Sequence, residues 1–182
     1  MINNKLIAAI GMSAFALCGT AAQAETQTGY LGGNIAFLEY SEDLISDDAS
    51  LTAIYGRVGM NLNANFSGEI RVGVGLGDDS VDVLGTEVDV ELDKMFGVYL
   101  RGGIPVAEGV FPYAIIGYTN GEVTASASGF GSESESESDV SFGVGIDFAL
   151  NDELTLNAEY MSYFDKDGAE IGGFALGVVT KF

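Results

Sequence analysis

The stretch that decides the fold is Gly172-Gly173-Phe174-Ala175-Leu176-Gly177-Val178-Val179-Thr180-Lys181-Phe182, at the end of the chain. Its larger side chains alternate with smaller ones, and a period of two residues predicts a β-strand. About ten residues is also the length of a strand that crosses a bilayer at a tilt. A strand that ends on an aromatic residue needs a partner for its edge, and we expect the first strand of the same chain to supply it.

This terminal pattern resembles the closing strand of bacterial outer-membrane β-barrels. In those families the C-terminal phenylalanine and the alternating apolar residues before it are read by the assembly machinery. The resemblance implies that the same signal is carried here by Phe174, Leu176, Val178 and Phe182. The alternative interpretation is an edge strand of a soluble β protein.

Seven further segments show the same alternation and are separated by polar residues or turn residues. They cover approximately residues 29–40, 51–63, 66–77, 91–103, 111–120, 140–150 and 154–160. With the closing segment they make eight strands, and an even number of antiparallel strands closes into a barrel with both ends of the chain on one side. We therefore predict an all-β, eight-stranded antiparallel up-and-down transmembrane β-barrel. Both faces of the fifth segment are partly apolar, so its orientation is left open.

The first 24 residues have the features of a secretory signal peptide. Lys5 is their only charged residue, and the apolar run 6–17 is too short to span a bilayer as a helix. Ala22 and Ala24 fit a small-x-small cleavage site, so we expect residues 1–24 to be removed and residues 25–182 to form one barrel domain. The only cysteine, Cys18, lies in the removed part, which leaves the mature chain without a thiol.

The charge balance is strongly acidic. The chain has 7 basic and 27 acidic residues, a formal net charge of −20, and no histidine. Such a surface disfavours nucleic acid and anionic lipid as partners and favours cations. Hydrolytic mechanisms usually use histidine as a general base, and no other catalytic constellation is present. We therefore expect no enzyme activity, no cofactor and no metal centre.

The two faces of the strands differ in a way that sets their orientation. One face is rich in valine, leucine, isoleucine and phenylalanine, and the other consists mainly of small residues with a few charges. The small face fits the narrow interior of an eight-stranded barrel, which leaves the apolar face to meet lipid. Charges in such an interior must pair, so we hypothesise a salt-bridge network that plugs the lumen. A gated ion path through the same side chains is the alternative. The residues concerned are Arg57, Glu69, Arg71, Arg101, Asp147 and Glu159.

Most acidic residues fall between the predicted strands. Connections after the second, fourth and sixth strands are short, whereas the others are longer and polar, as in barrels with short periplasmic turns and longer external loops. The segment 129–139 contains an alternating serine–glutamate run, residues 132–138, and is expected to be a mobile, solvated tip. These loops are interpreted as a hydrated surface that limits aggregation, or as weak binding sites for divalent cations that bridge to phosphates of the outer leaflet. The other loop acids are Glu42, Asp43, Asp47, Asp48, Asp78, Asp79, Asp82, Glu87, Asp89 and Glu91.

The mature chain as a whole resembles the small eight-stranded outer-membrane barrels, the porin-family group of OmpA-like, OmpX-like and opacity-type proteins. Local similarity lies in the stretch 96–102 before Pro105, and in Pro112-Tyr113-Ala114 with Gly117-Tyr118. The resemblance implies an integral protein of the outer membrane with a structural or surface-display role. Its expected partners are the barrel-assembly machinery during biogenesis and then the surrounding lipid and lipopolysaccharide, and it is expected to be a monomer. Members of the group serve as anchors, adhesins or complement-evasion factors. A small ion or solute channel is the alternative.

Overall fold

The computed structural model describes residues 28–42, 49–83, 86–127, 131–166 and 169–182. The expected signal peptide with its cleavage site at Ala22 and Ala24 lies outside these ranges, as do Asp43, Asp47 and Asp48. Within the ranges, no helix has the length and apolar character needed to span a bilayer.

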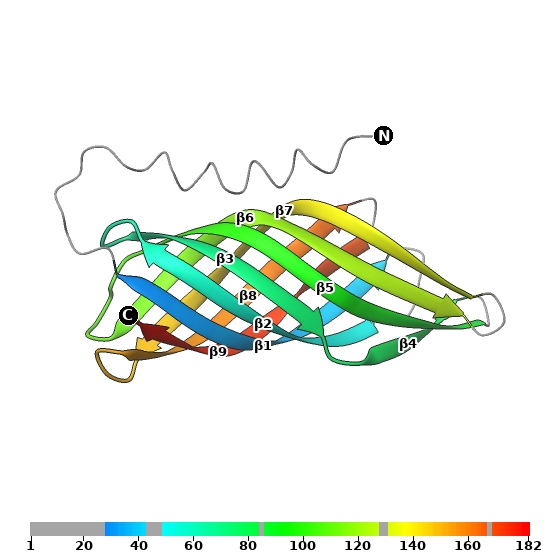
Figure 1. Cartoon of the computed structure of the whole chain (residues 1–182), viewed down its shortest axis with the longest axis horizontal. Helices are drawn as coiled ribbons and strands as arrows, with labels where there is room; N and C mark the ends of the chain where they lie inside the picture. Colours follow the sequence, from blue (N-terminus) through cyan, green and yellow to red (C-terminus); the bar gives the residue numbers. More distant parts are fainter. Residues whose placement is uncertain (1–27, 43–48, 84–85, 128–130, 167–168) are drawn as a thin grey trace.

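Nine strands follow one another along the chain (Figure 1). They are β1 (Gly29–Glu42), β2 (Ala49–Asn61), β3 (Phe66–Gly75), β4 (Asp78–Val83), β5 (Thr86–Gly103), β6 (Val110–Ala127), β7 (Gly131–Ala149), β8 (Leu154–Lys166) and β9 (Ala169–Lys181). Every pairing is antiparallel, and β3 and β4 pair with successive parts of β5, so that together they form one stave of the barrel. The break between them contains Gly77, whose φ of 89° suits glycine. The predicted third strand therefore ends at Gly75 and not at Gly77.

The first and last strands close the barrel. β1 pairs with β9 from Tyr30 opposite Lys181 to Glu42 opposite Ala169. With β3 and β4 counted as one stave, the result is a closed eight-stranded antiparallel barrel, and the fold class predicted from the sequence is confirmed. The closing strand presents Phe174, Leu176 and Val178 outward, exposed by 66, 56 and 45%.

The apolar face of the strands points away from the barrel axis. On β7, Phe142, Val144 and Phe148 are exposed by 55, 61 and 42%. The fifth stave, whose orientation the sequence left open, is β6: its Tyr113 and Ile115 are buried inside the barrel. A continuous belt of exposed valine, leucine, isoleucine and phenylalanine around a closed sheet is the surface that a bilayer stabilises.

Glycines on the inner face make room for tyrosines. A Cβ atom at Gly59 would overlap the ring of Tyr30, and one at Gly117 would overlap the ring of Tyr99. The ring of Tyr113 lies over Gly145 in the same way. Because an eight-stranded barrel is only wide enough to be filled by its own side chains, large residues of one strand require small ones on its neighbours. These inward glycines are therefore a packing requirement of the lumen.

The two ends of the barrel differ. One end carries the turns between β2 and β3, β5 and β6, and β7 and β8, together with Gly29 and Phe182, whose backbones are joined by a hydrogen bond of 2.9 Å. At the other end β4 to β7 extend past the remaining strands (right of Figure 1). We call these the turn end and the far end.

At the far end, the prediction of long polar loops is wrong. β1, β4, β6 and β8 each run to within a few residues of the next strand, and the acidic positions Glu42, Asp78, Asp79, Asp82, Glu87, Asp89 and Glu91 belong to strands. The serine–glutamate run, expected to be a mobile tip, is part of β7 and pairs along its length with β6. Its period of two separates serine from glutamate on opposite faces, and β6 supplies polar partners, such as the Asn120 amide that donates to Ser138 Oγ at 2.8 Å.

Candidate functional site in the barrel lumen

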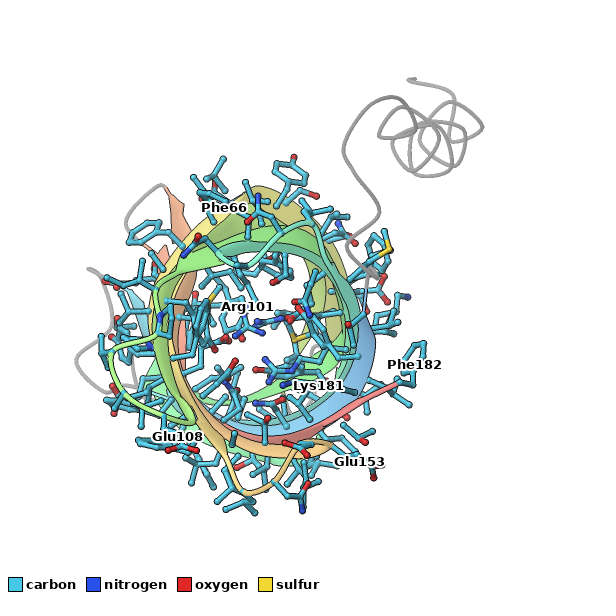
Figure 2. All side chains as sticks on the ribbon, turned by 90° about the vertical axis from the view of Figure 1, so that its left-hand side faces the viewer. Phe66, Arg101, Glu108, Glu153, Lys181 and Phe182 are labelled. Atoms are coloured by element: carbon cyan, nitrogen blue, oxygen red, sulfur yellow. The ribbon has the colours of Figure 1, made fainter. Side chains whose placement is uncertain are left out.

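The structure brings the six charged residues singled out in the sequence into the lumen. Strand alternation turns each of them inward from β2, β3, β5, β7 or β8. Five are buried almost completely, and the Asp147 side chain is 19% exposed. Figure 2 looks into the barrel from the turn end and shows Arg101 in the middle of the ring of strands.

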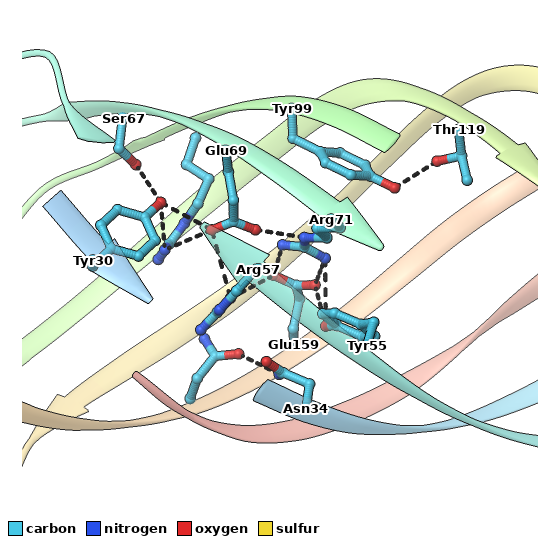
Figure 3. A network of polar contacts seen from close by, with 12 residues as sticks. Tyr30, Asn34, Tyr55, Arg57, Ser67, Glu69, Arg71, Tyr99, Thr119 and Glu159 are labelled. Atoms are coloured by element: carbon cyan, nitrogen blue, oxygen red, sulfur yellow. Dashed lines mark hydrogen bonds and ion pairs between the residues drawn. The ribbon is translucent and has the colours of Figure 1, made fainter. Parts of the chain in front are cut away.

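Arg71 is the centre of the network (Figure 3). Its Nη2 donates to Glu159 Oε2 at 2.8 Å and its Nη1 donates to Glu159 Oε1, while its Nε donates to Glu69 at 2.5 Å. One guanidinium thus joins a carboxylate of β3 to a carboxylate of β8 across the barrel. The rings of Tyr55 and Tyr99 also lie near it, with centroids 5.1 and 4.6 Å from its Cζ. Bidentate pairing of this kind is the strongest form of arginine–carboxylate contact.

Arg101 extends the network toward the turn end. It donates to Asp147 Oδ2 at 2.6 Å and to Glu69 Oε2 at 3.4 Å. Its Cζ lies 3.8 Å from the ring centroid of Tyr113, a cation–π contact inside the lumen. Arg101 therefore connects β5 with β3, β6 and β7.

Arg57 is held by charge more than by hydrogen bonds. Its Nη1 lies 3.8 Å from Glu69 Oε2 and 3.9 Å from Glu159 Oε2. Among the described residues none of its three nitrogens has a hydrogen-bond partner, although the side chain is completely buried. Gly32 on β1 provides its space, because a Cβ there would stand 3.1 Å from the arginine Nε. Two nearby carboxylates offset the cost of burying this cation.

Tyrosines and asparagines complete the network, and the sequence analysis did not assign them to it. Tyr30 donates to Glu69 Oε2 at 2.9 Å, and Tyr113 donates to Glu159 Oε2 at 2.8 Å. Asn157 Nδ2 donates to the Tyr113 hydroxyl and to Asp147 Oδ1, both at 2.7 Å. For Asn157 the sequence could have indicated this role, because it alternates in step with Glu159 on β8, whereas the strands of Tyr30 and Tyr113 carry none of the six charges.

Two layers of buried side chains lie in the lumen. The layer nearer the turn end pairs three arginines with three carboxylates, so its formal charge is zero. Toward the far end lies a layer of mostly apolar buried side chains, which includes Leu38, Leu51, Leu92, Met95, Met161 and Tyr163. A cavity of about 420 Å³ opens at the turn end and is lined at its inner side by Tyr30, Arg101 and Asp147. Within the described ranges, no group of three or more histidine, cysteine, aspartate or glutamate side chains is placed to hold a metal ion.

Comparison with known proteins gives one family and several related folds. The family model described as outer membrane protein beta-barrel domain matches residues 7–182. The crystal structure of Ail, the attachment invasion locus protein of Yersinia pestis, has a TM-score of 0.63 at 18% identity and covers 86% of this chain and 99% of that chain. Ail has also been crystallised with the heparin analogue sucrose octasulfate, and that structure has a TM-score of 0.60 at 18% identity over 86 and 99% of the two chains.

Neisserial surface protein A is similar as well, with a TM-score of 0.66 at 14% identity over 85% of this chain and 97% of that chain. At such low identities these structures share the fold alone. A search of curated protein sequences finds no match.

Proposed function

The chain belongs to the family of outer-membrane β-barrel domains, and from that premise we propose that it is a closed barrel of the bacterial outer membrane that displays an acidic sheet at the cell surface. The observation that carries the proposal is the filled lumen. Among the described residues, the neutral ionic layer around Arg71 and the apolar layer beyond it place buried side chains across the lumen. Both layers oppose the passage of ions, so we infer that the barrel acts through what it presents outside, and not through what it conducts.

The difference between the two ends supports an orientation of the barrel in the outer membrane. Short turns, the start of β1 at Gly29 and the terminal Phe182 lie at the turn end, which in this class of barrel faces the periplasm. The far end then stands outside the cell, where β4 to β7 project beyond the other strands (Figure 1). The barrel serves as a rigid support for this projection, and lipid and lipopolysaccharide surround its apolar belt. We expect it to act as a monomer.

The chemistry of the far end favours cationic partners. Exposed carboxylates there include Glu91, Glu135 and Glu170, and the chain carries a net charge of −20. Ail was crystallised with a polysulfated heparin analogue, whereas an acidic surface repels such a ligand. We propose that adhesion or other surface contacts of this protein involve basic groups, or divalent cations that bridge to anionic neighbours.

Planar-bilayer recordings of the refolded mature protein test the closed barrel. We expect no large, stable single-channel steps, because buried ion pairs and apolar side chains fill the lumen. Replacing Arg71 and Glu159 together by serine removes the central pair, so this variant should pass small, unsteady currents. Frequent, uniform steps from the unmodified protein would instead support the channel.

Assembly in cells tests the role proposed for the terminal residues. Phe182→Ala should remove most of the heat-modifiable barrel from the outer membrane, because the assembly machinery is expected to read this residue. The matched control is Phe148→Ala, another outward phenylalanine, on β7, which should retain near-normal levels. Equal losses from the two variants, measured by quantitative gel analysis of membrane fractions, would rule out a special role for the terminus.

A further inference from the structure

The cavity at the turn end is framed by the whole circumference of the barrel. Every stave supplies a residue to its lining, and among these residues are Tyr30 of β1, Arg101 of β5, Asp147 of β7 and Lys181 of β9. Its volume of about 420 Å³ lies within the range of pockets that bind small molecules, about 300–1,000 Å³. The cavity therefore has room for a ligand that consists of one ring and a short chain.

The charges around this cavity are the reverse of those of the chain. Among the described residues its lining contains three charged side chains, the cations Arg101 and Lys181 and the carboxylate Asp147. Asp147 is already engaged, because Arg101 Nη2 donates to it at 2.6 Å and Asn157 Nδ2 donates to it at 2.7 Å. The ion pairs of the described residues do not include Lys181. One positive charge of the lining is therefore uncompensated, although the chain as a whole carries −20.

Arg101 keeps hydrogen-bonding capacity for a ligand. A guanidinium has five N–H donors in a rigid fork. Besides the contact with Asp147, those of Arg101 make only two longer contacts, of 3.4 Å with Glu69 Oε2 and 3.5 Å with the Tyr30 hydroxyl. Within the described residues its Nε is buried and has no hydrogen-bond partner. A buried donor without an acceptor costs free energy, and an acceptor oxygen that a ligand brings to this guanidinium would reduce that cost.

Lys181 stands across the barrel from Arg101. The order of the staves places β9 and β5 on opposite sides of the barrel axis. Figure 2 shows both side chains inside the ring of strands at the turn end. The lysine side chain is exposed, and its long flexible stem lets the ammonium group follow a ligand that the guanidinium holds. An anionic group between the two cations is attracted from both sides.

The rest of the lining sets the size and polarity of the ligand. Phe111 is half-buried and Val179 is buried, and both line the cavity with apolar surface. Small-molecule sites combine apolar walls of this kind with a few polar groups that fix the orientation. One uncompensated cation suits a single negative charge, since a second negative charge would lie near Asp147 without a partner of its own. The lining thus favours a monoanion with an apolar body over a dianion.

We propose that the turn-end cavity binds a small monocarboxylate with an apolar body. Its carboxylate lies between Arg101 and Lys181, and its body lies against Phe111 and Val179. Guanidinium–carboxylate pairing is short, directional and stronger than a neutral hydrogen bond. Only the compartment from which the ligand enters, the periplasm, rests on the proposed function. The binding site itself is formed by side chains of the lumen.

The test uses the full mature protein, refolded into nanodiscs of zwitterionic lipid, with empty nanodiscs as the blank. The probe is para-fluorophenylbutyrate, titrated at physiological salt and followed by its fluorine NMR signal. The uncharged amide of the same acid controls for partition into lipid and for apolar contact. We expect the acid to bind about tenfold more tightly than the amide. The corresponding phosphate monoester, a dianion, should bind more weakly than the acid.

Variants locate the site. Lys181→Gln removes one cation and should weaken binding of the acid about fivefold. Lys94→Gln makes the same change at an exposed lysine of β5 that does not line the cavity, so it should bind like the unmodified protein. Ala149→Phe adds a ring to the lining and should weaken binding about tenfold, whereas Leu150→Phe, at the adjacent exposed position outside the lining, should not. Heat-modifiable gel mobility confirms that each variant is folded.

The outcomes separate this inference from the proposed function. Equal binding of acid and amide, or no binding of the acid, would overturn the site. Equal effects of Lys181→Gln and Lys94→Gln, or of Ala149→Phe and Leu150→Phe, would also overturn it, and so would tighter binding of the phosphate than of the acid. Bilayer conductance is measured independently. A conducting barrel that still selects the acid would contradict the closed lumen and leave the binding site intact.

Discussion

Replacing Arg71 by methionine should lower the free energy of unfolding by about 3–5 kcal/mol, the cost of breaking a buried ion pair from one side. Methionine fills much of the same space, but Glu69 and Glu159 would lose the guanidinium that both of them contact. Both carboxylates are completely buried, so water cannot replace it. Unfolding by denaturant in detergent micelles, followed by circular dichroism and heat-modifiable gel mobility, measures the change.

An exposed ion pair of the same protein is the control. Lys94 Nζ lies 2.9 Å from Glu122 Oε1, but the lysine side chain is 63% exposed. Lys94→Met should therefore leave the free energy of unfolding almost unchanged. The double variant Arg71→Met with Glu159→Gln should lose less than the sum of its single changes, because the pair shares one network. Equal costs for Arg71→Met and Lys94→Met would show that the lumen network contributes nothing beyond a surface contact.

Gly117→Ala should destabilise the barrel by about 1–3 kcal/mol, the range for overpacking an interior. The added Cβ would overlap Tyr99 Cδ1 and the carbonyl oxygen of Val98. Tyr99 cannot move freely, because its hydroxyl bonds Thr119 Oγ1 at 2.6 Å and its ring contacts Arg71. Denaturant unfolding again gives the change in free energy, and loss of folded protein in refolding trials would be the extreme form of the same effect.

Gly68→Ala is the matched control for this prediction. A Cβ at Gly68 meets no atom within 4 Å. Alanine there should leave stability unchanged or raise it slightly, because it restricts the unfolded chain without a clash. If Gly68→Ala and Gly117→Ala had the same effect, glycine would matter for the flexibility of the strands and not for the space it gives to tyrosine.

The barrel could be predicted because its spanning strands obey a single rule. Bulky apolar residues alternate with small ones, as in Phe142 to Phe148, and closure follows once eight such segments are present. Registers and bulges could not be predicted in the same way. They depend on contacts between strands, such as the shift near Ser162 in β8.

The far end was misjudged for a physical reason. The serine–glutamate run has a strand's period but no apolar face, so its composition indicated a solvated loop. Pairing with β6 makes it a strand, and that partner includes Val123 and Thr124, which favour extended backbone. Sequence composition reports how well a segment fits a core, whereas an extension of an existing sheet needs only a neighbouring ladder.

The charged residues of the lumen could be predicted, but the contacts between them could not. Inward positions of the six charged residues follow from alternation alone. That Arg71 joins Glu69 to Glu159 depends on the distance across the closed barrel, which a single strand does not reveal. The tyrosines were underestimated because aromatic residues fit both a lipid face and an interior, and only the facing glycines distinguish the two.

The central claim is that the apolar face meets lipid while the glycine and tyrosine face is enclosed. The sequence contains no tryptophan, so Phe142→Trp and Tyr163→Trp each give a protein with a single tryptophan. The two positions lie at nearly the same level of the barrel, since Phe142 pairs with Ser162, but Phe142 is 55% exposed and Tyr163 only 2%. In liposomes of phospholipids with brominated acyl chains, we expect strong quenching of the tryptophan at 142 and weak quenching of that at 163. The reverse pattern would contradict the account.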